Sequence, residues 1–362
     1  MAGLLYAPRS MPDPATLHLR LFQFRCHEEL RVELPVGRHF FFGSNGQGKT
    51  SLLEAVYFLS RLRSFRTAQT RELVCWQRDC FRVEAKLGET ALAATWSPTG
   101  RELVLDGKPV ASAVDFWGQL ATVLFIGEDR ELVTGSGAGR RNWVDGLIAQ
   151  REPGYLATAQ QYARALKQRN AWLRQGGEDR RVGESLTQLV TEHGLAMTRA
   201  RRAITEPLSL AVSEAVRALS GERDTVTLRY RSSFSLDAAP DWASVAAGEQ
   251  RFQATLLGPH RDDWILERNG KSLGKFGSEG QQRTTALALR LAEAQLIRER
   301  RGQWPVFLMD DVAPQLDENR QAALRALLPA EAFILITAPE DRGWTTPQDF
   351  RWMVSPSKAE AA

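Results

Sequence analysis

Residues 43–50, GSNGQGKT, match the pattern G-x-x-x-x-G-K-[ST] of a phosphate-binding loop in full. Glycines in such a loop let backbone N–H groups surround phosphate oxygens, the lysine neutralises the β and γ oxygens, and the hydroxyl reaches Mg²⁺. Lys49 and Thr50 take the last two roles here, and Lys49 is also expected to assist the reaction. The predicted ATP contacts of the loop are Gly43, Ser44, Asn45, Gly46, Gln47, Gly48, Lys49, Thr50 and Ser51.

The run PVFLMDDV, residues 305–312, is an apolar strand pattern that ends in two acids, and it predicts the metal side of the same site. Asp310 is placed to hold Mg²⁺ together with Thr50. Asp311 can orient or deprotonate the attacking water. Because neighbouring residues of a strand point to opposite faces, we expect the two carboxylates to have different roles.

The stretch GSEGQQRTTALALR, residues 277–290, predicts the start of a helix suited to a negative ligand. Ser278 and Gln281 have the spacing of a capping box. Apolar residues then recur at helical spacing. A helix start beside a glycine, here Gly280, leaves N–H groups open to an anion. The chain therefore has two helix starts that suit phosphate, far apart in the sequence.

The elements that must position these motifs alternate between strand and helix patterns, which predicts an α/β fold. Short, almost wholly apolar runs are typical of central strands buried on both faces. The expected strands lie within residues 17–41, 81–110, 122–127, 225–234, 305–312 and 332–339, and helices are expected after residue 50 and, broken at residues 174–183, over about 155–219. We predict a disordered tail at 1–16, a head formed by 17–150 and 225–362, and an inserted helical lid at 151–224.

Size and composition fit a soluble protein of two or three domains: the chain has 362 residues, 43% hydrophobic and 25% charged. It contains no apolar run of membrane-spanning length, and its proline-containing N-terminus does not resemble a signal peptide. Cys26, Cys75 and Cys80 lack metal-ligand spacing and indicate reduced thiols in a cytoplasmic protein.

The net charge of +4 is concentrated in two basic stretches. Residues 61–82 hold six arginines and two acids, and residues 140–174 hold seven basic residues and two acids. This asymmetry favours a polyanion bound through its phosphates, without sequence preference. The alternative is that these are solvated faces, with half of the cations paired to local acids. The predicted DNA contacts are Arg63, Arg66, Arg140, Arg141, Lys167 and Arg169.

The phosphate loop and the S-x-G-Q helix start together resemble the ABC-type ATPases. In that family the loop of one protomer holds ATP and the signature helix of a second protomer closes over the γ-phosphate. The residues that match the signature are Ser278, Gly280, Gln281 and Gln282. APQLDENR, residues 313–320, resembles the D-loop, with Asp317 facing the partner. Thr337 occupies the switch position and is implied to be catalytic.

A more specific resemblance, from about Leu17 to about residue 340, is to the RecF family of bacterial recombination mediators. It rests on the stretches GSNGQGKTSLLEAVYFLS, RSFRT, GEDRELVTGSGAGRRNWVD, YARALKQRN, LLGPHRDD, GSEGQQRTTALALRLAEAQLI and FLMDDVAPQLDENR, in this order. The resemblance implies an ABC-type head with a short lid, ATP and Mg²⁺ as cofactors, and an ATP-dependent homodimer. It also implies DNA binding at gaps, weak DNA-stimulated ATP hydrolysis, and work with RecR and RecO in loading RecA, without nuclease activity.

Several positions depart from the family pattern. Arg25, in Gln23-Phe24-Arg25-Cys26, is expected to reach the nucleotide, but Cys26 stands where the family has Asn. Gly127 replaces a proline, and no Q-loop glutamine is evident. His260 is either catalytic or, as we favour, part of a hydrogen-bonded turn.

Three other functions are weaker alternatives. A transporter subunit needs a membrane partner and usually a switch histidine, and an ATPase-nuclease needs a further acidic domain. An ATPase that gates a protein or membrane partner without DNA conflicts with the two basic stretches. The sequence therefore predicts an ATP-dependent DNA-binding protein of recombinational repair.

Overall fold

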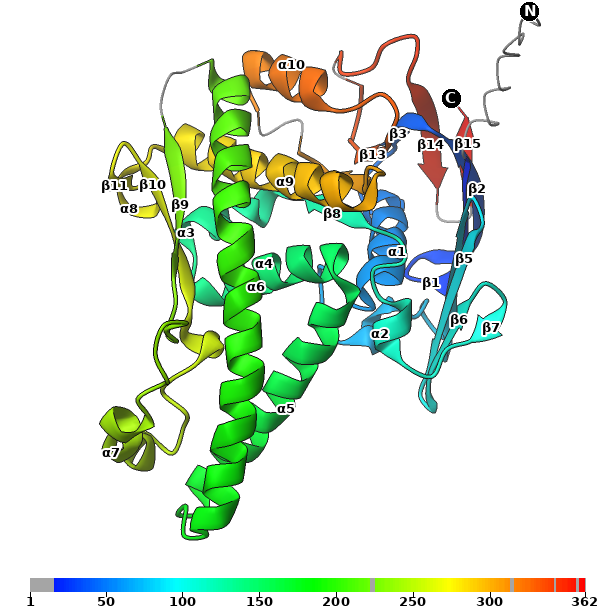
Figure 1. The fold of residues 1–362 in the computed structure, drawn as a ribbon. Helices are drawn as coiled ribbons and strands as arrows, with labels where there is room; N and C mark the ends of the chain where they lie inside the picture. Colours follow the sequence, from blue (N-terminus) through cyan, green and yellow to red (C-terminus); the bar gives the residue numbers. More distant parts are fainter. Residues whose placement is uncertain (1–15, 222–224, 313–315, 342, 356–357, 362) are drawn as a thin grey trace, which may run out of the picture. The chain divides into compact units, whose positions relative to one another are not determined.

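A computed structural model describes residues 16–221, 225–312, 316–341, 343–355 and 358–361 (Figure 1). The chain forms two compact units. The first unit comprises residues 1–119, 306–310 and 329–362, and the second comprises 120–305 and 311–328. Described segments from the N-terminal and the C-terminal parts of the chain thus enter one unit, but its boundary lies near residue 119 and not at 150, so the predicted head and lid do not coincide with the units. The predicted tail lies outside the described residues, except Thr16, which already belongs to a strand.

The first unit contains an antiparallel sheet with the strand order β2-β1-β4-β5-β6-β7. Its strands are β1 (Thr16–Phe24), β2 (His27–Pro35), β4 (Phe81–Leu87), β5 (Thr90–Ser97), β6 (Gly100–Leu105) and β7 (Lys108–Pro109). Leu17, Leu19 and Leu21 of β1 are buried while the alternate residues are not, which is the period of a sheet with one buried face. The predicted antiparallel strands within 81–110 are confirmed.

A second, mainly parallel sheet of the first unit joins strands from the two ends of the chain. Strands β15 (Lys358–Ala361), β14 (Phe350–Ser355), β3 (Gly37–Phe42), β13 (Phe333–Thr337) and β12 (Val306–Asp310) follow one another in this order. Strands β12 and β13 are buried almost throughout, as their apolar runs predict. Helix α1 (Lys49–Arg61) packs against both sheets and supplies much of the core between them.

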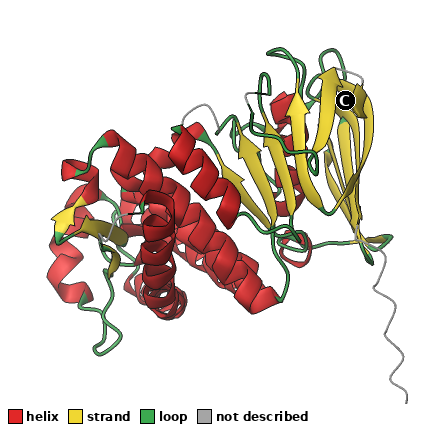
Figure 2. Ribbon diagram, turned by 90° about the horizontal axis from the view of Figure 1, so that it is seen from above, coloured by secondary structure: helices red, strands yellow, loops and turns green. Residues whose placement is uncertain are grey.

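The second unit is mostly helical, and its long helices pack on one another (Figure 2). Helices α5 (Pro153–Arg174) and α6 (Arg180–Ser220) confirm the predicted helical region, with a break at 175–179. Helix α6 packs on α5 and on α9 (Glu279–Arg301). The other elements are β8 (Thr122–Phe125), α3 (Glu131–Thr134), α4 (Gly137–Arg151), β9 (Val226–Arg231), α7 (Trp242–Phe252), β10 (Asp263–Arg268), β11 (Lys271–Ser272), α8 (Leu273–Phe276) and α10 (Glu318–Leu327).

Candidate functional site

The phosphate-binding loop lies between β3 and α1, the strand-loop-helix context that the motif requires. Gly43 and Gly48 have φ of 144° and 95°, values that side chains with a Cβ rarely adopt. A Cβ at Gly43 would come within 2.9 Å of the carbonyl oxygen of Val354, and one at Gly48 within 2.6 Å of Cys26 Sγ. Both glycines are therefore required by backbone conformation and by close neighbours.

Lys49 lies across its own loop. Its Nζ donates hydrogen bonds to the carbonyl oxygens of Gly43, at 2.6 Å, and Ser44, at 3.0 Å, and the residue is only 9% exposed. These bonds hold the ammonium group against the carbonyl groups of the loop.

Asp310 joins the end of β12 to two hydroxyl groups. Its Oδ1 accepts hydrogen bonds from Thr50 Oγ1, at 2.8 Å, and from Thr337 Oγ1, at 2.7 Å. Thr337 is the register partner of Asp310 in the parallel pair of β12 and β13. The predicted metal ligands Thr50 and Asp310 thus lie together, and hydroxyl and carboxylate oxygens suit Mg²⁺. The catalytic role of Thr337 remains a prediction.

Asp311 leaves the strand in a left-handed conformation, with φ of 50°, and it is exposed. The expectation that strand alternation separates it from Asp310 is wrong, because β12 ends at Asp310. Asp311 is instead the first residue after the strand, at a bend of the backbone. Such a conformation in a residue other than glycine costs about 1–3 kcal/mol and is concentrated at functional sites. Its assignment as base remains a prediction.

The helix start in the second unit has the predicted cap. Ser278 Oγ accepts a hydrogen bond from the Gln281 N–H at 3.3 Å, and Gln281 Oε1 accepts one from the Ser278 N–H at 2.9 Å, which completes a capping box. Gln282 Nε2 donates to the Gly277 carbonyl at 3.0 Å. The prediction of a capped helix is confirmed, while its contact with a nucleotide stays a prediction.

The predicted D-loop residue Asp317 is bonded to Arg320, and the Arg320 side chain lies near the start of α9. Asp317 caps α10: its Oδ1 accepts a hydrogen bond from the Arg320 N–H at 3.0 Å, and this bond, with the Arg320 charge, lowers the pKa of the Asp317 carboxyl. A Cβ on Gly280 would lie 3.4 Å from Arg320 Nη2. The Arg320 guanidinium therefore lies close to Gly280 as well as to Asp317. Residues 313–315 of the D-loop lie outside the described residues.

Arg25 is held by an acid that the sequence did not single out. Its Nε and Nη2 donate to the Glu54 carboxylate at 2.8 and 2.7 Å, and its Nη1 donates to the Glu72 carbonyl at 2.8 Å. Glu54 is fully buried. An acid within the apolar helix pattern SLLEAVYFLS is the signal that could have identified it. The guanidinium is thus positioned inside the protein, and its contact with the nucleotide remains a prediction.

Two predicted DNA contacts are wrong, because both guanidinium groups are buried. Arg140 is 9% exposed and pairs with Asp263 at 2.8 Å. Arg169 is 4% exposed and pairs with Glu249 at 2.7 Å. Breaking such a pair leaves a buried charge unmatched, at a cost of about 3–5 kcal/mol. These arginines hold the second unit together and are not available to phosphates.

The other four predicted DNA contacts are less buried. Arg66 Nη1 lies 3.4 Å from Glu54, with 46% of its side chain exposed. Three of the six cations thus pair with acids, but the acids that pair with Arg140 and Arg169 lie 123 and 80 residues away and are not the local acids of the alternative. Arg141 Nη1 donates to the Asp262 carbonyl at 2.8 Å. Arg63 and Lys167 are exposed and have no ion-pair partner among the described residues. Their contact with DNA stays a prediction.

His260 uses both ring nitrogens inside the second unit. Its Nε2 lies 2.9 Å from the Thr255 carbonyl, so it must donate there, and Nδ1 then accepts the Tyr162 hydroxyl at 2.7 Å. Burial lowers the pKa of His260, which keeps the ring neutral. This arrangement supports the hydrogen-bonded turn.

The segment after β8 is tied to helix α9 by buried charges that the sequence analysis missed. Arg290 donates from Nε and Nη2 to Asp129 Oδ1 at 3.1 and 2.6 Å, and from Nη1 to Glu293 at 2.9 Å. Trp143 Nε1 also donates to Glu293, at 2.7 Å. These contacts hold the Gly127–Arg130 turn against the signature helix.

Cys26 packs directly against the phosphate-binding loop. Burial raises the pKa of its thiol, but the hydrogen bond and charge of the buried His27 outweigh this effect and lower the pKa. All three cysteines are free thiols.

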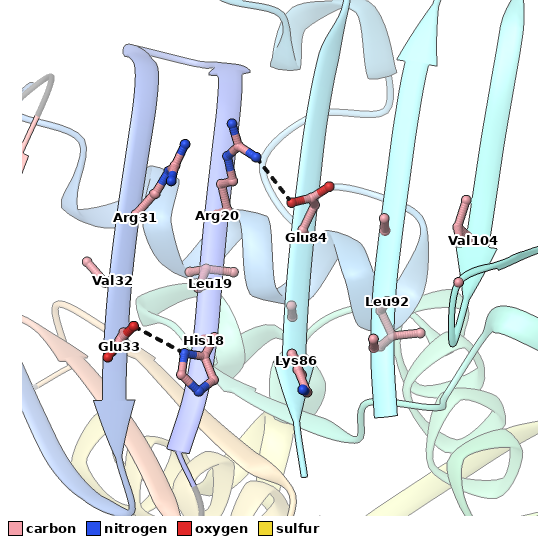
Figure 3. Close-up of a pocket in the computed structure, with 14 residues that line it drawn as sticks. His18, Leu19, Arg20, Arg31, Val32, Glu33, Glu84, Lys86, Leu92 and Val104 are labelled. Carbon is pink, nitrogen blue, oxygen red and sulfur yellow. Dashed lines mark ion pairs between the residues drawn. The ribbon is translucent and has the colours of Figure 1, made fainter. Parts of the chain in front are cut away.

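A hollow of about 360 Å³ lies on a face of the antiparallel sheet (Figure 3). The ion pairs His18–Glu33, at 3.4 Å, and Arg20–Glu84, at 3.8 Å, are among the residues that line it. The hollow includes none of the residues predicted to bind nucleotide, metal or DNA. Across the described residues, every helix is too short or too polar to cross a lipid bilayer.

Comparison with protein-family models finds no match. Curated relatives are similar over most of the chain. The DNA replication and repair protein RecF of Exiguobacterium sp. is 36% identical over 324 residues, which are 84% of this chain and 87% of the relative. The protein of the same name from Thermosynechococcus vestitus is 38% identical over 327 residues, which are 85% and 86% of the two chains.

Solved structures agree with these relatives. The recombination mediator protein RecF-ATPrS in the RecFOR pathway has a TM-score of 0.88 and 26% identity over 96% of this chain and 98% of that chain. The RecF-ATP structure has the same TM-score at 24% identity over 99% and 100%. The Smc head domain of Pyrococcus furiosus has a TM-score of 0.55 at 15% identity over 96% of each chain. These similarities confirm the predicted ABC-type α/β fold.

Proposed function

The chain belongs to the RecF family of DNA replication and repair proteins, and from this membership we propose that ATP joins two copies of the chain around DNA at gaps. It is an ATP-binding ATPase of the ABC type that acts in recombinational repair. The observation that carries the proposal is that phosphate-binding elements occur as two incomplete half-sites, one in each unit.

The first half-site comprises the phosphate-binding loop and the carboxylate of β12. Lys49 neutralises the phosphates, and the loop N–H groups surround them. Thr50 and Asp310, whose oxygens lie 2.8 Å apart, are the residues that would hold Mg²⁺. When bound, the ion neutralises charge on the β and γ oxygens. Asp311 orients or deprotonates the attacking water, and Thr337 fixes the position of Asp310.

The second half-site is the start of α9. Its N–H groups at Glu279 and Gly280 have no acceptor within the helix, as at any helix start, so they favour an anion. We assign this anion as the γ-phosphate of ATP held by a second copy of the chain. Asp317 lies beside it, anchored through Arg320, and is placed to face the same partner.

Hydrolysis then resets the pair. Slow, DNA-stimulated turnover would release DNA after the dimer has marked a gap or a junction of duplex and single strand. RecR and RecO are the proposed protein partners in loading RecA, and the cytoplasm, where the chromosome lies, is the proposed location. Arg63, Arg66 and Lys167 supply exposed charge for DNA phosphates, and the half-buried Arg141 adds to it.

The test is the solution mass of the Asp311→Asn variant by light scattering after size exclusion, with and without ATP-Mg²⁺ and a gapped duplex. Asn tolerates the left-handed conformation of this position, so the variant should keep its fold. We expect a monomer without ATP, and with ATP a dimer that elutes with DNA. An ATP-dependent dimer that does not bind DNA would indicate a protein or membrane partner. Rapid ATP hydrolysis by this variant would show that a residue other than Asp311 is the catalytic base.

A matched pair of variants tests the second half-site. Ser278→Arg blocks the approach of a partner, whereas Ser278→Ala removes only the cap, at about 1 kcal/mol of stability. We expect the arginine variant to bind ATP normally but to remain a monomer, while the alanine variant still dimerises. A dimer of the arginine variant would contradict the trans arrangement.

A further inference from the structure

Trp76 is the most exposed large apolar side chain of the described residues, at 85%. Tryptophan has a large apolar ring surface, which is usually buried in a core or an interface. This residue lies in the first unit, between the short helical turn Thr70–Leu73 and strand β4. Neither the nucleotide site nor any contact described above uses it.

The turn that carries Trp76 is fixed and not loose. The Arg78 N–H donates to the Cys75 carbonyl at 3.1 Å, so Trp76 and Gln77 are the central residues of a β-turn. Gln77 has φ of 61°, a left-handed conformation that glycine usually takes at this position.

Two backbone hydrogen bonds anchor this turn to the end of β1. The Cys75 N–H donates to the Gln23 carbonyl at 2.8 Å, and the Arg25 N–H donates to the Leu73 carbonyl at 2.7 Å. The indole is therefore held out in solvent by backbone that is already ordered, so a ligand would bind it with little further loss of conformational entropy.

The sequence around this turn is rich in arginine. Residues 63–78 contain four arginines and a single acid, Glu72. Arg63 and Arg71 are exposed, and neither side chain has an ion-pair partner among the described residues. Arg78 pairs with Glu28 at 3.0 Å, but both side chains are about half exposed or more, and such pairs are weak. Arg63 and Arg71 can therefore bind phosphates directly, and Arg78 can exchange Glu28 for a phosphate.

We propose that Trp76 stacks on an unpaired base of single-stranded DNA while neighbouring arginines bind its phosphates. An aromatic ring beside cations is the general chemistry of single-strand binding, because every base has a face that can stack. Paired bases are already stacked inside a duplex, so this contact selects the single-stranded part of a gap. The inference rests on the proposed DNA binding and adds to it a contact that tells a gap from intact duplex.

The surroundings of Trp76 favour a base over a protein partner. Residues that anchor protein interfaces are usually surrounded by a contiguous apolar patch that excludes water. Here Gln77, Arg78 and Asp79, which follow Trp76 directly, are exposed and polar. A single ring between polar side chains suits a base, which has a flat face and polar edges.

The experiment compares the affinity of the full chain, with ATP-Mg²⁺, for a gapped duplex and for a fully paired duplex of the same length. Trp76→Ala should weaken binding to the gapped duplex about tenfold and leave the paired duplex within about twofold, since stacking on one base is worth on the order of one decade or more in affinity. Trp76→Phe should retain part of the preference. Phe252→Ala, which removes an aromatic side chain that is 63% exposed in α7, is the control and should change neither affinity.

A direct readout is photo-crosslinking to 5-iodo-deoxyuridine placed in the gap, followed by peptide mapping. A cross-link to Trp76 supports the inference. The inference is overturned if Trp76→Ala weakens binding to both DNAs equally, if its affinity for the gapped duplex is unchanged, or if the cross-link maps elsewhere. An unchanged DNA affinity with lost binding to RecR or RecO would show that Trp76 contacts a protein. If the unaltered chain binds neither DNA, the proposed function fails first, and the two failures are thus distinguishable.

Discussion

Arg169 was expected to contact DNA, whereas the structure makes it a structural residue, and the substitution Arg169→Met separates the two roles. Its Nη1 and Nη2 donate to the Glu249 carboxylate at 2.9 and 2.7 Å, Nη1 also donates to Thr255 Oγ1 at 3.0 Å, and the guanidinium lies 4.5 Å from the Trp242 ring. Methionine fills much of the same volume but leaves Glu249, only 2% exposed, without its cation.

The expected loss of unfolding free energy is about 3–5 kcal/mol, the cost of an unmatched buried charge. For a unit of about 200 residues this lowers Tm by on the order of 10 °C. Urea unfolding and a thermal melt at pH 7 measure both quantities. The double variant Arg169→Met with Glu249→Gln should recover part of the loss, since it removes the buried charge.

Lys167→Met is the matched control, because Lys167 lies on the same helix, is exposed, and has no ion-pair partner in the described chain. It should change stability by less than about 0.5 kcal/mol. DNA affinity per folded molecule should fall for Lys167→Met and not for Arg169→Met. The reasoning is refuted if Arg169→Met keeps its stability and loses DNA affinity.

Three further predictions follow from buried polar groups. Burial lowers the pKa of His39 to about 4, so below about pH 6.5 the unfolded chain binds a proton that the folded chain does not bind. The free energy of unfolding should therefore fall by up to about 3 kcal/mol between pH 6.5 and 4. Urea titrations at each pH should show a smaller loss in His39→Gln. Glu54→Gln removes the charged partner of Arg25 and should cost about 1.5–3 kcal/mol in urea unfolding; an unchanged midpoint would mean that the pair does not stabilise the fold. Tyr162→Phe leaves His260 Nδ1 without its hydrogen-bond donor, so it should lower the free energy of unfolding by about 1–3 kcal/mol and leave ATP hydrolysis intact. A stable variant that has lost ATP hydrolysis would instead indicate a catalytic role for His260.

The sequence predicted the elements whose determinants are local. The phosphate-binding loop needs glycines at fixed positions, and the capping box of α9 needs Ser278 and Gln281 three residues apart, so both could be identified before the structure. The apolar runs of β12 and β13 likewise predicted central strands. The end of β12 could not be placed to the residue, because the left-handed conformation of Asp311 is set by its tertiary surroundings and not by its type.

The fate of the cations could not be predicted because their partners are distant in the sequence. Asp263 lies 123 residues after Arg140, and Glu249 lies 80 residues after Arg169. A count of charges over a window of sequence includes such arginines but excludes the acids that neutralise them. The count of basic residues in the two stretches was therefore correct, but the prediction that all six selected cations lie on the surface was partly wrong.

The surfaces that remain basic are smaller and better defined than the stretches. In residues 140–174 the described exposed cations include Lys167 but not Arg140 or Arg169. In residues 63–78 Arg63 and Arg71 stay exposed, and the same stretch contains the fixed turn that carries Trp76. Because each phosphate contact adds about one unit to the slope of log affinity against log salt, a charge that is already paired inside the protein contributes nothing to that slope. The salt dependence of DNA binding therefore reports the exposed cations alone, and it distinguishes the cations that bind DNA from those that hold the fold.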